Sequence, residues 1–292
     1  MIKKLFPIAM VALTIASCGG NAQNNAPNAA KCDQNAAADC CNAASQVSDY
    51  KFLDAKEKTF DGFTVYWLKD NEGDRKFPFD LFGNVADDIK KEVNMPDGMP
   101  SSISAYLIKT NGKNILFDSG LGKKANGQLL NELSKVGVSP EQVDYVYITH
   151  FHGDHIGGMV DSLGNKVFTN AEVYVSHLEK ESELGKGEQA QKMFETYGDK
   201  IHEFNHGDTL PQDVKAIEAI GHTPGHTVFQ KGNLLIIGDL MHALALQYPY
   251  PEYNANFDGD KEKSAAARKR ILQYAKDNGL TICGMHLVIP KK

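Results

Sequence analysis

The chain has 292 residues, with 42% hydrophobic and 23% charged side chains and a formal net charge of −6 at pH 7. This composition is typical of a globular protein and excludes collagen-like, wholly disordered and multi-span membrane proteins. The excess of acidic over basic residues disfavours a nucleic-acid partner, because contacts to phosphates require a basic surface. It favours neutral or cationic small molecules as substrates.

Residues 1–17 have the pattern of an export signal. Lys3 and Lys4 precede an apolar run that is too short to span a bilayer, and the run ends in Ile15-Ala16-Ser17-Cys18, which resembles a bacterial lipobox. We predict a lipoprotein signal peptide over residues 1–17 and a lipid on Cys18. The exported protein would then be anchored to a bacterial membrane, with its domain on the periplasmic or extracellular side. A plain secretory signal cut nearby is the alternative.

Residues 18–48 are rich in Asn and Ala and show no apolar periodicity. This composition predicts a lipidated tether, followed by a globular domain over residues 49–292. Cys32, Cys40 and Cys41 lie in the tether, and in an oxidising compartment they can pair with one another or with another chain. A soft-metal site at Cys40 and Cys41 is a weaker alternative. Cys283 lies in an apolar run and is predicted to be a buried small side chain.

Short strand patterns alternate with helical patterns through the globular part. Phe63, Val65 and Trp67 have strand periodicity, and Asn111-Gly112 predicts a hairpin between two further strands. Helical spacing of apolar residues follows, and a second helix ends at Gly279. This mixed order favours a core of two sheets with helices outside. The predicted strands cover residues 103–109, 114–118, 143–149, 172–176, 214–220 and 234–237, and the predicted helices cover residues 128–136 and 263–278.

The strongest motif is Thr149-His150-Phe151-His152-Gly153-Asp154-His155, directly after a predicted buried strand. Imidazoles and carboxylates are the ligands that zinc, iron and manganese take in proteins. At a strand end, His150 and His152 can reach one ion, while the following turn brings Asp154 and His155 toward a second. A solvated polar loop is the alternative, but this spacing rarely arises by chance.

Ligand-type residues also follow three later apolar runs. A glycine-rich loop at residues 221–227 contains His222 and His226, a predicted strand leads to Asp239, and a late apolar run leads to His286. Because strand ends converge on functional sites, we expect this later part of the chain to supply ligands to the same centre.

These motifs, in order from Asp118 to His286, resemble those of the metallo-β-lactamase-fold superfamily. The resemblance covers the chain from about Phe60 onward. It implies an α+β fold, the αββα four-layer sandwich, with a dinuclear metal site along one edge. Residues 49–292 would then be a hydrolase domain of this fold.

The family pattern implies that two divalent ions bind to seven side chains. The first ion would take His150, His152 and His226, the second would take Asp154, His155 and His286, and Asp239 would bridge the two. Asp118 would support these ligands from behind, and His242 would donate a hydrogen bond nearby. His222 is expected to have a structural role outside the ligand set. Zinc is the first choice for both ions, with iron and manganese as alternatives.

Asp239 argues against true β-lactamases of this fold, which lack the bridging carboxylate. Residues 221–227, 238–242 and 257–272 resemble the branch of methyl-parathion hydrolase-like enzymes and quorum-quenching lactonases. That resemblance implies a hydroxide between the two ions that opens lactones or cleaves esters and phosphotriesters. Asp154 would be the catalytic residue that orients this hydroxide and carries its proton to the leaving group. The hairpin between His226 and Asp239 is shorter than this branch predicts, which affects the pocket wall.

The substrate pocket is expected in loops rather than in the metal motifs. Residues 77–82 and 94–102 can form a lid, and Tyr248, Tyr250 and Tyr253 can form the opposite wall, or these aromatic residues can belong to the core. A β-lactam hydrolase, a di-iron redox protein and a non-catalytic lipoprotein that binds a metal or a partner remain as alternative functions. The sequence leaves the oligomeric state open.

Overall fold

A computed structural model describes residues 50–289 of the chain. The predicted signal peptide and tether, with Cys18, Cys32, Cys40 and Cys41, lie outside these residues. Within residues 50–289, no helix is long and apolar enough to cross a membrane.

Seven strands form the first sheet, in the order β10-β9-β8-β7-β6-β3-β2. Strands β6 and β7 make the predicted hairpin, in which Asn111 and Gly112 have φ angles of 50° and 70°, a conformation that these two residue types favour. From β7 to β10 neighbouring strands are parallel, so their carboxyl ends share one edge of the sheet. The strands are β2 (Glu57–Phe60), β3 (Phe63–Lys69), β6 (Ser104–Thr110), β7 (Lys113–Phe117), β8 (Tyr145–Tyr147), β9 (Glu172–Ser176) and β10 (Ile201–Phe204).

Six strands form the second sheet, in the order β1-β15-β14-β13-β12-β11. The last strand, β15, lies between β14 and β1 and is parallel to both. The first described strand of the chain is therefore paired with its last. The strands are β1 (Lys51–Phe52), β11 (Thr209–Leu210), β12 (Val214–Glu218), β13 (Thr227–Lys231), β14 (Leu234–Ile236) and β15 (Thr281–Cys283).

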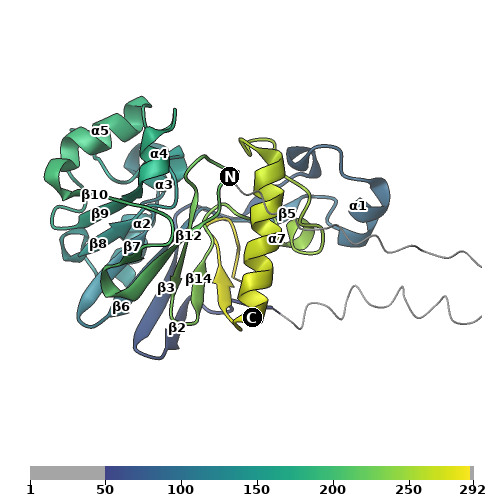
Figure 1. Ribbon diagram of the computed structural model, residues 1–292, viewed down its shortest axis with the longest axis horizontal. Helices are drawn as coiled ribbons and strands as arrows, with labels where there is room; N and C mark the ends of the chain where they lie inside the picture. The colour runs from purple at the N-terminus through teal and green to yellow at the C-terminus, as the bar shows by residue number, and fades with distance from the viewer. Residues whose placement is uncertain (1–49, 290–292) are drawn as a thin grey trace, which may run out of the picture. The chain divides into compact units, whose positions relative to one another are not determined.

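The two sheets pack face to face, with helices on both outer faces (Figure 1). Alternation along β6 shows how the sequence specifies this arrangement, because Tyr106 and Ile108 enter the core between the sheets while Leu107 packs under the helices. The helices α2 (Leu129–Lys135) and α5 (Glu188–Tyr197) cover the first sheet, and α7 (Lys261–Asp277) covers the second. The predicted αββα sandwich is confirmed. Cys283 lies in the core between the sheets, as predicted.

A smaller apolar cluster lies outside the sandwich and combines two distant segments of the chain. One contains β4 (Arg75–Phe77), α1 (Asp87–Val93) and β5 (Met99–Ser101), and the other contains α6 (Leu244–Gln247). The sequence patterns did not predict these elements. The remaining short helices are α3 (Gly153–Ile156), α4 (His177–Glu181), η2 (Phe79–Phe82), η3 (Lys123–Ala125), η4 (Pro140–Gln142), η5 (Gly198–Lys200) and η6 (Pro211–Asp213).

The predicted elements are present, with small differences at their ends. The largest difference concerns the predicted strand over residues 143–149, since β8 is only Tyr145–Tyr147. At its end, the Thr149 N–H donates to the Asp118 carboxylate at 2.8 Å. The chain leaves the sheet there because a side chain, not a neighbouring strand, accepts this hydrogen bond.

Candidate metal centre

Three strand ends bring the candidate ligands together at one edge of the sandwich. His150 and His152 follow β8, Asp239 follows β14, and His286 follows β15. The turn before Asp239 requires glycine, because Gly238 has a φ of 53° and a Cβ there would lie 2.5 Å from Nε2 of His226. Gly238 therefore lets the turn that carries Asp239 lie directly against His226.

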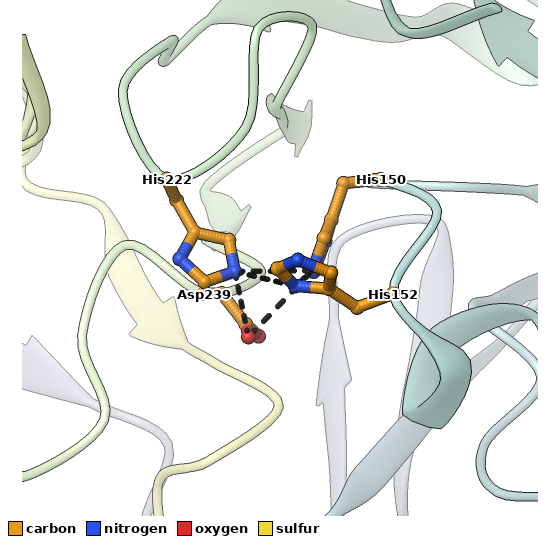
Figure 2. A group of neighbouring side chains, drawn as sticks. All are labelled: His150, His152, His222 and Asp239. Atoms are coloured by element: carbon orange, nitrogen blue, oxygen red, sulfur yellow. Dashed lines mark hydrogen bonds and ion pairs between the residues drawn. The ribbon is translucent and has the colours of Figure 1, made fainter. Parts of the chain in front are cut away.

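His150, His152, His222 and Asp239 form a cluster that we name the first group. Figure 2 shows the three imidazoles and the carboxylate pointing toward one another. Nδ1 of His152 lies 3.0 Å from Nε2 of His150 and 2.9 Å from Nε2 of His222, and the two Nε2 atoms are 3.2 Å apart. Oδ2 of Asp239 lies 3.3 Å from Nε2 of His222.

Asp154, His155 and His286 form a second group, and Asp239 lies between it and the first. Nε2 of His155 is 3.1 Å from Oδ1 of Asp239, and Nε2 of His286 is 3.0 Å from Oδ2. Each of these ring nitrogens also lies 3.7 Å from a carboxylate oxygen of Asp154. Asp239 is therefore the residue that connects the two groups.

The structure differs from the sequence prediction in the glycine-rich loop. Its first histidine, His222, belongs to the first group, whereas His226 was predicted to belong to it. Both ring nitrogens of His226 bond to the backbone: Nδ1 contacts the Ala219 carbonyl at 3.1 Å, and Nε2 accepts the Asp239 N–H at 3.0 Å. His226 thus holds the turn that carries Asp239 and has no nitrogen left for an ion.

The geometry of the two groups fits divalent cations. In a tetrahedral zinc site with Zn–N bonds of about 2.0–2.1 Å, the ligand nitrogens lie roughly 3.3 Å apart, which is close to the spacing in the first group. Nε2 of His155 and Oδ1 of Asp239 are buried, and neither forms a hydrogen bond. Buried polar atoms normally have a partner, and a cation between these two atoms would supply one.

The protonation states are consistent with cation binding. Burial lowers the pKa of His150 well below its usual value, and burial together with His222 lowers the pKa of His152 to about 4. Burial alone would raise the pKa of Asp239, but His155 and His286 hold it well below its usual value. Neutral imidazoles next to an ionised carboxylate are the forms that bind divalent ions.

Two histidines of the centre differ from this pattern. Burial disfavours their charged forms, but hydrogen bonds to Asp239 and Asp258 raise the pKa of His222 to about 9. Asp239 and Asp154 likewise raise the pKa of His155 well above its usual value, against the effect of burial. A cation that binds beside Asp239 would take the place of the ring proton that faces it on each of these two histidines.

In each group, a buried carboxylate contacts the Nδ1 atom of one histidine whose Nε2 faces the cluster. Asp118, as predicted, lies behind the second group and contacts Nδ1 of His155 at 2.7 Å. Asp258 has the same relation to the first group, because its Oδ1 lies 2.8 Å from Nδ1 of His222. Such partners fix the ring orientation of a metal-binding histidine. The role of Asp258 was not predicted, although Phe257-Asp258 contributed to the family resemblance.

His242 lies beside the first and second groups, as predicted, with Nε2 3.2 Å from Oδ2 of Asp239. It also forms a third candidate cluster with Asp239 and His286. Burial lowers its pKa to about 4. Its Nδ1 is buried without a hydrogen-bond partner, and its ring packs against those of Phe257 and His286.

Arg268, on α7, bonds to the segment of the chain that follows Asp239. Its guanidinium group is fully buried and donates to the backbone carbonyls of Leu240 at 2.7 Å, Pro251 at 2.7 Å and Tyr253 at 3.0 Å. It also lies 3.5 Å from Oδ2 of Asp258. One cation on α7 therefore fixes the chain between Asp239 and Asp258.

The aromatic residues near the site divide into core and rim. Phe82, predicted as part of a lid, is only 3% exposed and packs in the small apolar cluster, with Tyr250 and Tyr253 against it. Tyr248 packs against the core under α7. By contrast, Phe257 is 41% exposed, and its ring lies 4.7 Å from that of His242. Phe257 is thus an apolar side chain at the open rim of the centre.

Residues 98–286 match the family model described as the metallo-beta-lactamase superfamily. The chain belongs to this superfamily. Its structure is similar to that of AidC, a dizinc quorum-quenching lactonase solved with the product N-hexanoyl-L-homoserine, with a TM-score of 0.71 and 27% identity over 80% of this chain and 91% of AidC. It is also similar to the hydrolase AbOPH, with a TM-score of 0.69 and 26% identity over 82% and 92% of the two chains.

Curated relatives match over shorter stretches. The N-acyl homoserine lactonase of Bacillus thuringiensis is 28% identical over 177 residues, which is 51% of this chain and 65% of that protein. Exodeoxyribonuclease WalJ of Streptococcus pneumoniae is 33% identical over 38% of this chain and 45% of its own length. Ribonuclease Z of Nanoarchaeum equitans is 41% identical over only 19% of its length. The chain thus spans less than two thirds of each of these relatives.

Proposed function

We propose that this protein is a metal-dependent lactone hydrolase that binds two divalent ions, with zinc as the first choice. The observation that carries the proposal is the position of Asp239 between the two groups of histidines. The overall similarity to AidC, a dizinc lactonase, supports the substrate class. Esters and phosphotriesters are the next candidates, because they present a similar electrophilic centre to the same groups.

In this proposal, His150, His152 and His222 would hold the first ion, His155, His286 and Asp154 would hold the second, and Asp239, which lies between the two groups, would be available to either. Bound divalent ions supply Lewis acidity and lower the pKa of a bound water. The chain's own residues then orient the reactants and move protons.

Asp154 is the proposed proton carrier. Its side chain is 26% exposed, more than any other carboxylate of the two groups, so it can contact both water and substrate. Burial would raise its pKa, but His155 and His286 lower it, so Asp154 is ionised and can accept a proton. It would take the proton of the attacking water and return it to the leaving alcohol oxygen.

The open rim suggests how an acyl substrate binds. Phe257 offers an exposed aromatic face beside His222 and His242, with ring centroids 5.9 Å and 4.7 Å away. An apolar side chain next to polar catalytic groups is typical of pockets for small amphipathic ligands. We propose that Phe257 contacts the acyl chain while the lactone carbonyl faces the two groups.

The first experiment is a substrate panel on the zinc-loaded full chain. It contains acyl homoserine lactones, simple γ- and δ-lactones, an aryl phosphotriester and a β-lactam, and also an aryl phosphodiester because two of the similar curated proteins are nucleases. We expect kcat/KM to be highest for lactones. Higher kcat/KM for the phosphodiester or the β-lactam would contradict the proposed substrate class.

Replacing Asp154 tests the mechanism. Asp154→Ala is expected to lower kcat for lactones by about 10²–10⁴, the range typical of a lost general acid–base group. Metal content measured on the same sample separates the loss of proton transfer from the loss of an ion. Near-normal turnover in a folded, metal-loaded variant would remove Asp154 from the mechanism.

We propose further that the protein is an exported lipoprotein, on the basis of the lipobox pattern at Cys18. Cys18→Ser is expected to abolish incorporation of labelled fatty acid and to move the protein from the membrane fraction to a soluble fraction. Unchanged labelling of the variant would contradict this assignment.

A further inference from the structure

Glu179 is a buried carboxylate that bonds to two loops of the metal centre. It lies in α4 and is 0% exposed. Its Oε1 accepts the Phe151 N–H at 3.0 Å, and its Oε2 accepts the Thr223 hydroxyl at 2.8 Å and the Gly225 N–H at 2.7 Å. Both carboxylate oxygens are therefore used, each by a different loop.

The donors adjoin residues of the first group. Phe151 lies between His150 and His152 in the sequence, and Thr223 directly follows His222. The two loops come from different sheets, because one follows β8 and the other precedes β13. One side chain thus connects the two segments that supply all three histidines of the first group.

The glycine-rich loop also lies directly against the backbone of α4. A Cβ at Gly225 would be 2.2 Å from the backbone nitrogen of Glu179, a contact that no side chain can occupy. Glycine at this position permits the close approach, and the carboxylate then holds it through the Gly225 N–H. Shape and hydrogen bonding independently fix this loop to α4.

We propose that Glu179 is a positioning residue that sets the spacing between His222 and the pair His150 and His152, and thereby the affinity of the first group for a metal ion. This inference rests on the metal centre proposed above. Glu179 does not belong to the first group and acts through the Phe151 N–H and the loop around Thr223. Its loss leaves buried donors unpaired, so the two loops separate to reach water.

Glu179→Gln is the main test, because it keeps the volume but directs an amide N–H₂ group toward one of the two loops. The full chain is stripped of metal and titrated with Zn²⁺ against a chromophoric chelator, and Co²⁺ absorption reports the ligand geometry. We expect the affinity of the first site to fall by about 10–100-fold, as for other partners of metal ligands. The Co²⁺ spectrum is expected to shift toward that of His222→Gln.

Asp70→Asn is the matched control. Asp70 is also fully buried and accepts two backbone N–H groups, from Leu121 at 2.6 Å and Leu129 at 2.7 Å, but neither donor adjoins a residue of the first group. We expect this variant to lose thermal stability and to keep the affinity of the first site. Equal losses of affinity in both variants would show that Glu179 has only a general structural role and would overturn the proposal.

A milder variant keeps the proposal testable if Glu179→Gln does not fold. Thr223→Val keeps the shape of the side chain and removes one of the three donors to Glu179, so it should weaken the first site by less than Glu179→Gln does. Wild-type Zn²⁺ affinity and Co²⁺ spectra in the folded variants would overturn the role of Glu179. If the wild-type chain itself binds fewer than two ions, the proposed metal centre fails instead.

Discussion

The two groups of the candidate metal centre are held in different ways. The second group is supported by residues at strand ends: Asp118, at the end of β7, contacts His155, and the Ser102 carbonyl, between β5 and β6, contacts Nδ1 of His286 at 2.7 Å. The first group is supported from the outer layers, by Glu179 in α4 and Asp258 just before α7. The first group therefore depends on contacts from α4 and from the segment before α7, whereas the second depends on residues at the ends of strands.

The two histidines of the glycine-rich loop should show the largest difference in metal content and stability when each is replaced. His222→Gln is expected to lose one zinc ion per chain and most of the activity, because it removes a histidine that contacts both His150 and His152. His226→Gln is expected to retain two ions and to lower the melting temperature, because His226 bonds only to backbone groups.

Metal analysis after dialysis, together with thermal unfolding, distinguishes these two histidines. The opposite result, with two ions retained in His222→Gln and one lost in His226→Gln, would restore the ligand set expected from the family pattern.

Replacing the supporting carboxylates, Asp118 and Asp258, should distinguish the two groups by smaller losses of zinc affinity. Asp118→Asn is expected to weaken zinc binding by the second group, and Asp258→Asn by the first group, each by about 10–100-fold. In both variants an amide replaces an oxygen that contacts a histidine or a backbone N–H.

Competitive zinc titration of the two variants and the double variant measures whether the effects are independent. If both substitutions weaken the same ion, the division of the centre into two separately supported groups is wrong.

Substitution of Phe257, at the exposed rim of the site, is expected to have the smallest effect on catalysis. Phe257→Ala should raise KM several-fold for long-chain acyl lactones and leave short-chain substrates and kcat nearly unchanged, because the exposed ring contributes only apolar contact. Phe82→Ala is the control: this buried ring should instead cost about 3–5 kcal/mol of stability without changing chain-length preference. Equal KM changes for long and short chains would exclude Phe257 from acyl binding.

The sequence predicts the sandwich because apolar side chains recur with strand periodicity and because turn residues such as Asn-Gly mark where the strands end. In β6, Tyr106 and Leu107 face different layers, and Asn111-Gly112 forms the expected hairpin turn. The small apolar cluster has no comparable signal, since its two segments are distant in the chain and each contributes only short elements. Its aromatic residues therefore could not be assigned to core or pocket beforehand.

The candidate ligands that directly follow strands are predictable because the strands themselves are visible in the sequence. The choice between His222 and His226 and the role of Glu179 depend instead on tertiary contacts. His222 and His226 occur in one glycine-rich loop, and only the packing of Gly225 on α4 and the position of the Ala219 carbonyl determine which ring faces the first group. Glu179 has no sequence signal, because a glutamate in a short helix is normally at the surface.

The pairing of β1 with β15 has a consequence for the order of assembly. Lys51 and Phe52 pair with Thr281 and Ile282, so the edge strand β1 has no partner in this sheet until residue 282 has been synthesised. His286 follows the same strand, and the loop around His222 also needs α7, against which Gly221 packs at Ser264. Contacts between residues so distant in the sequence carry a loop-closure cost that slows folding. The nascent chain therefore carries His150 and His152 well before it contains His286, so the second group is complete only after β15 has been made.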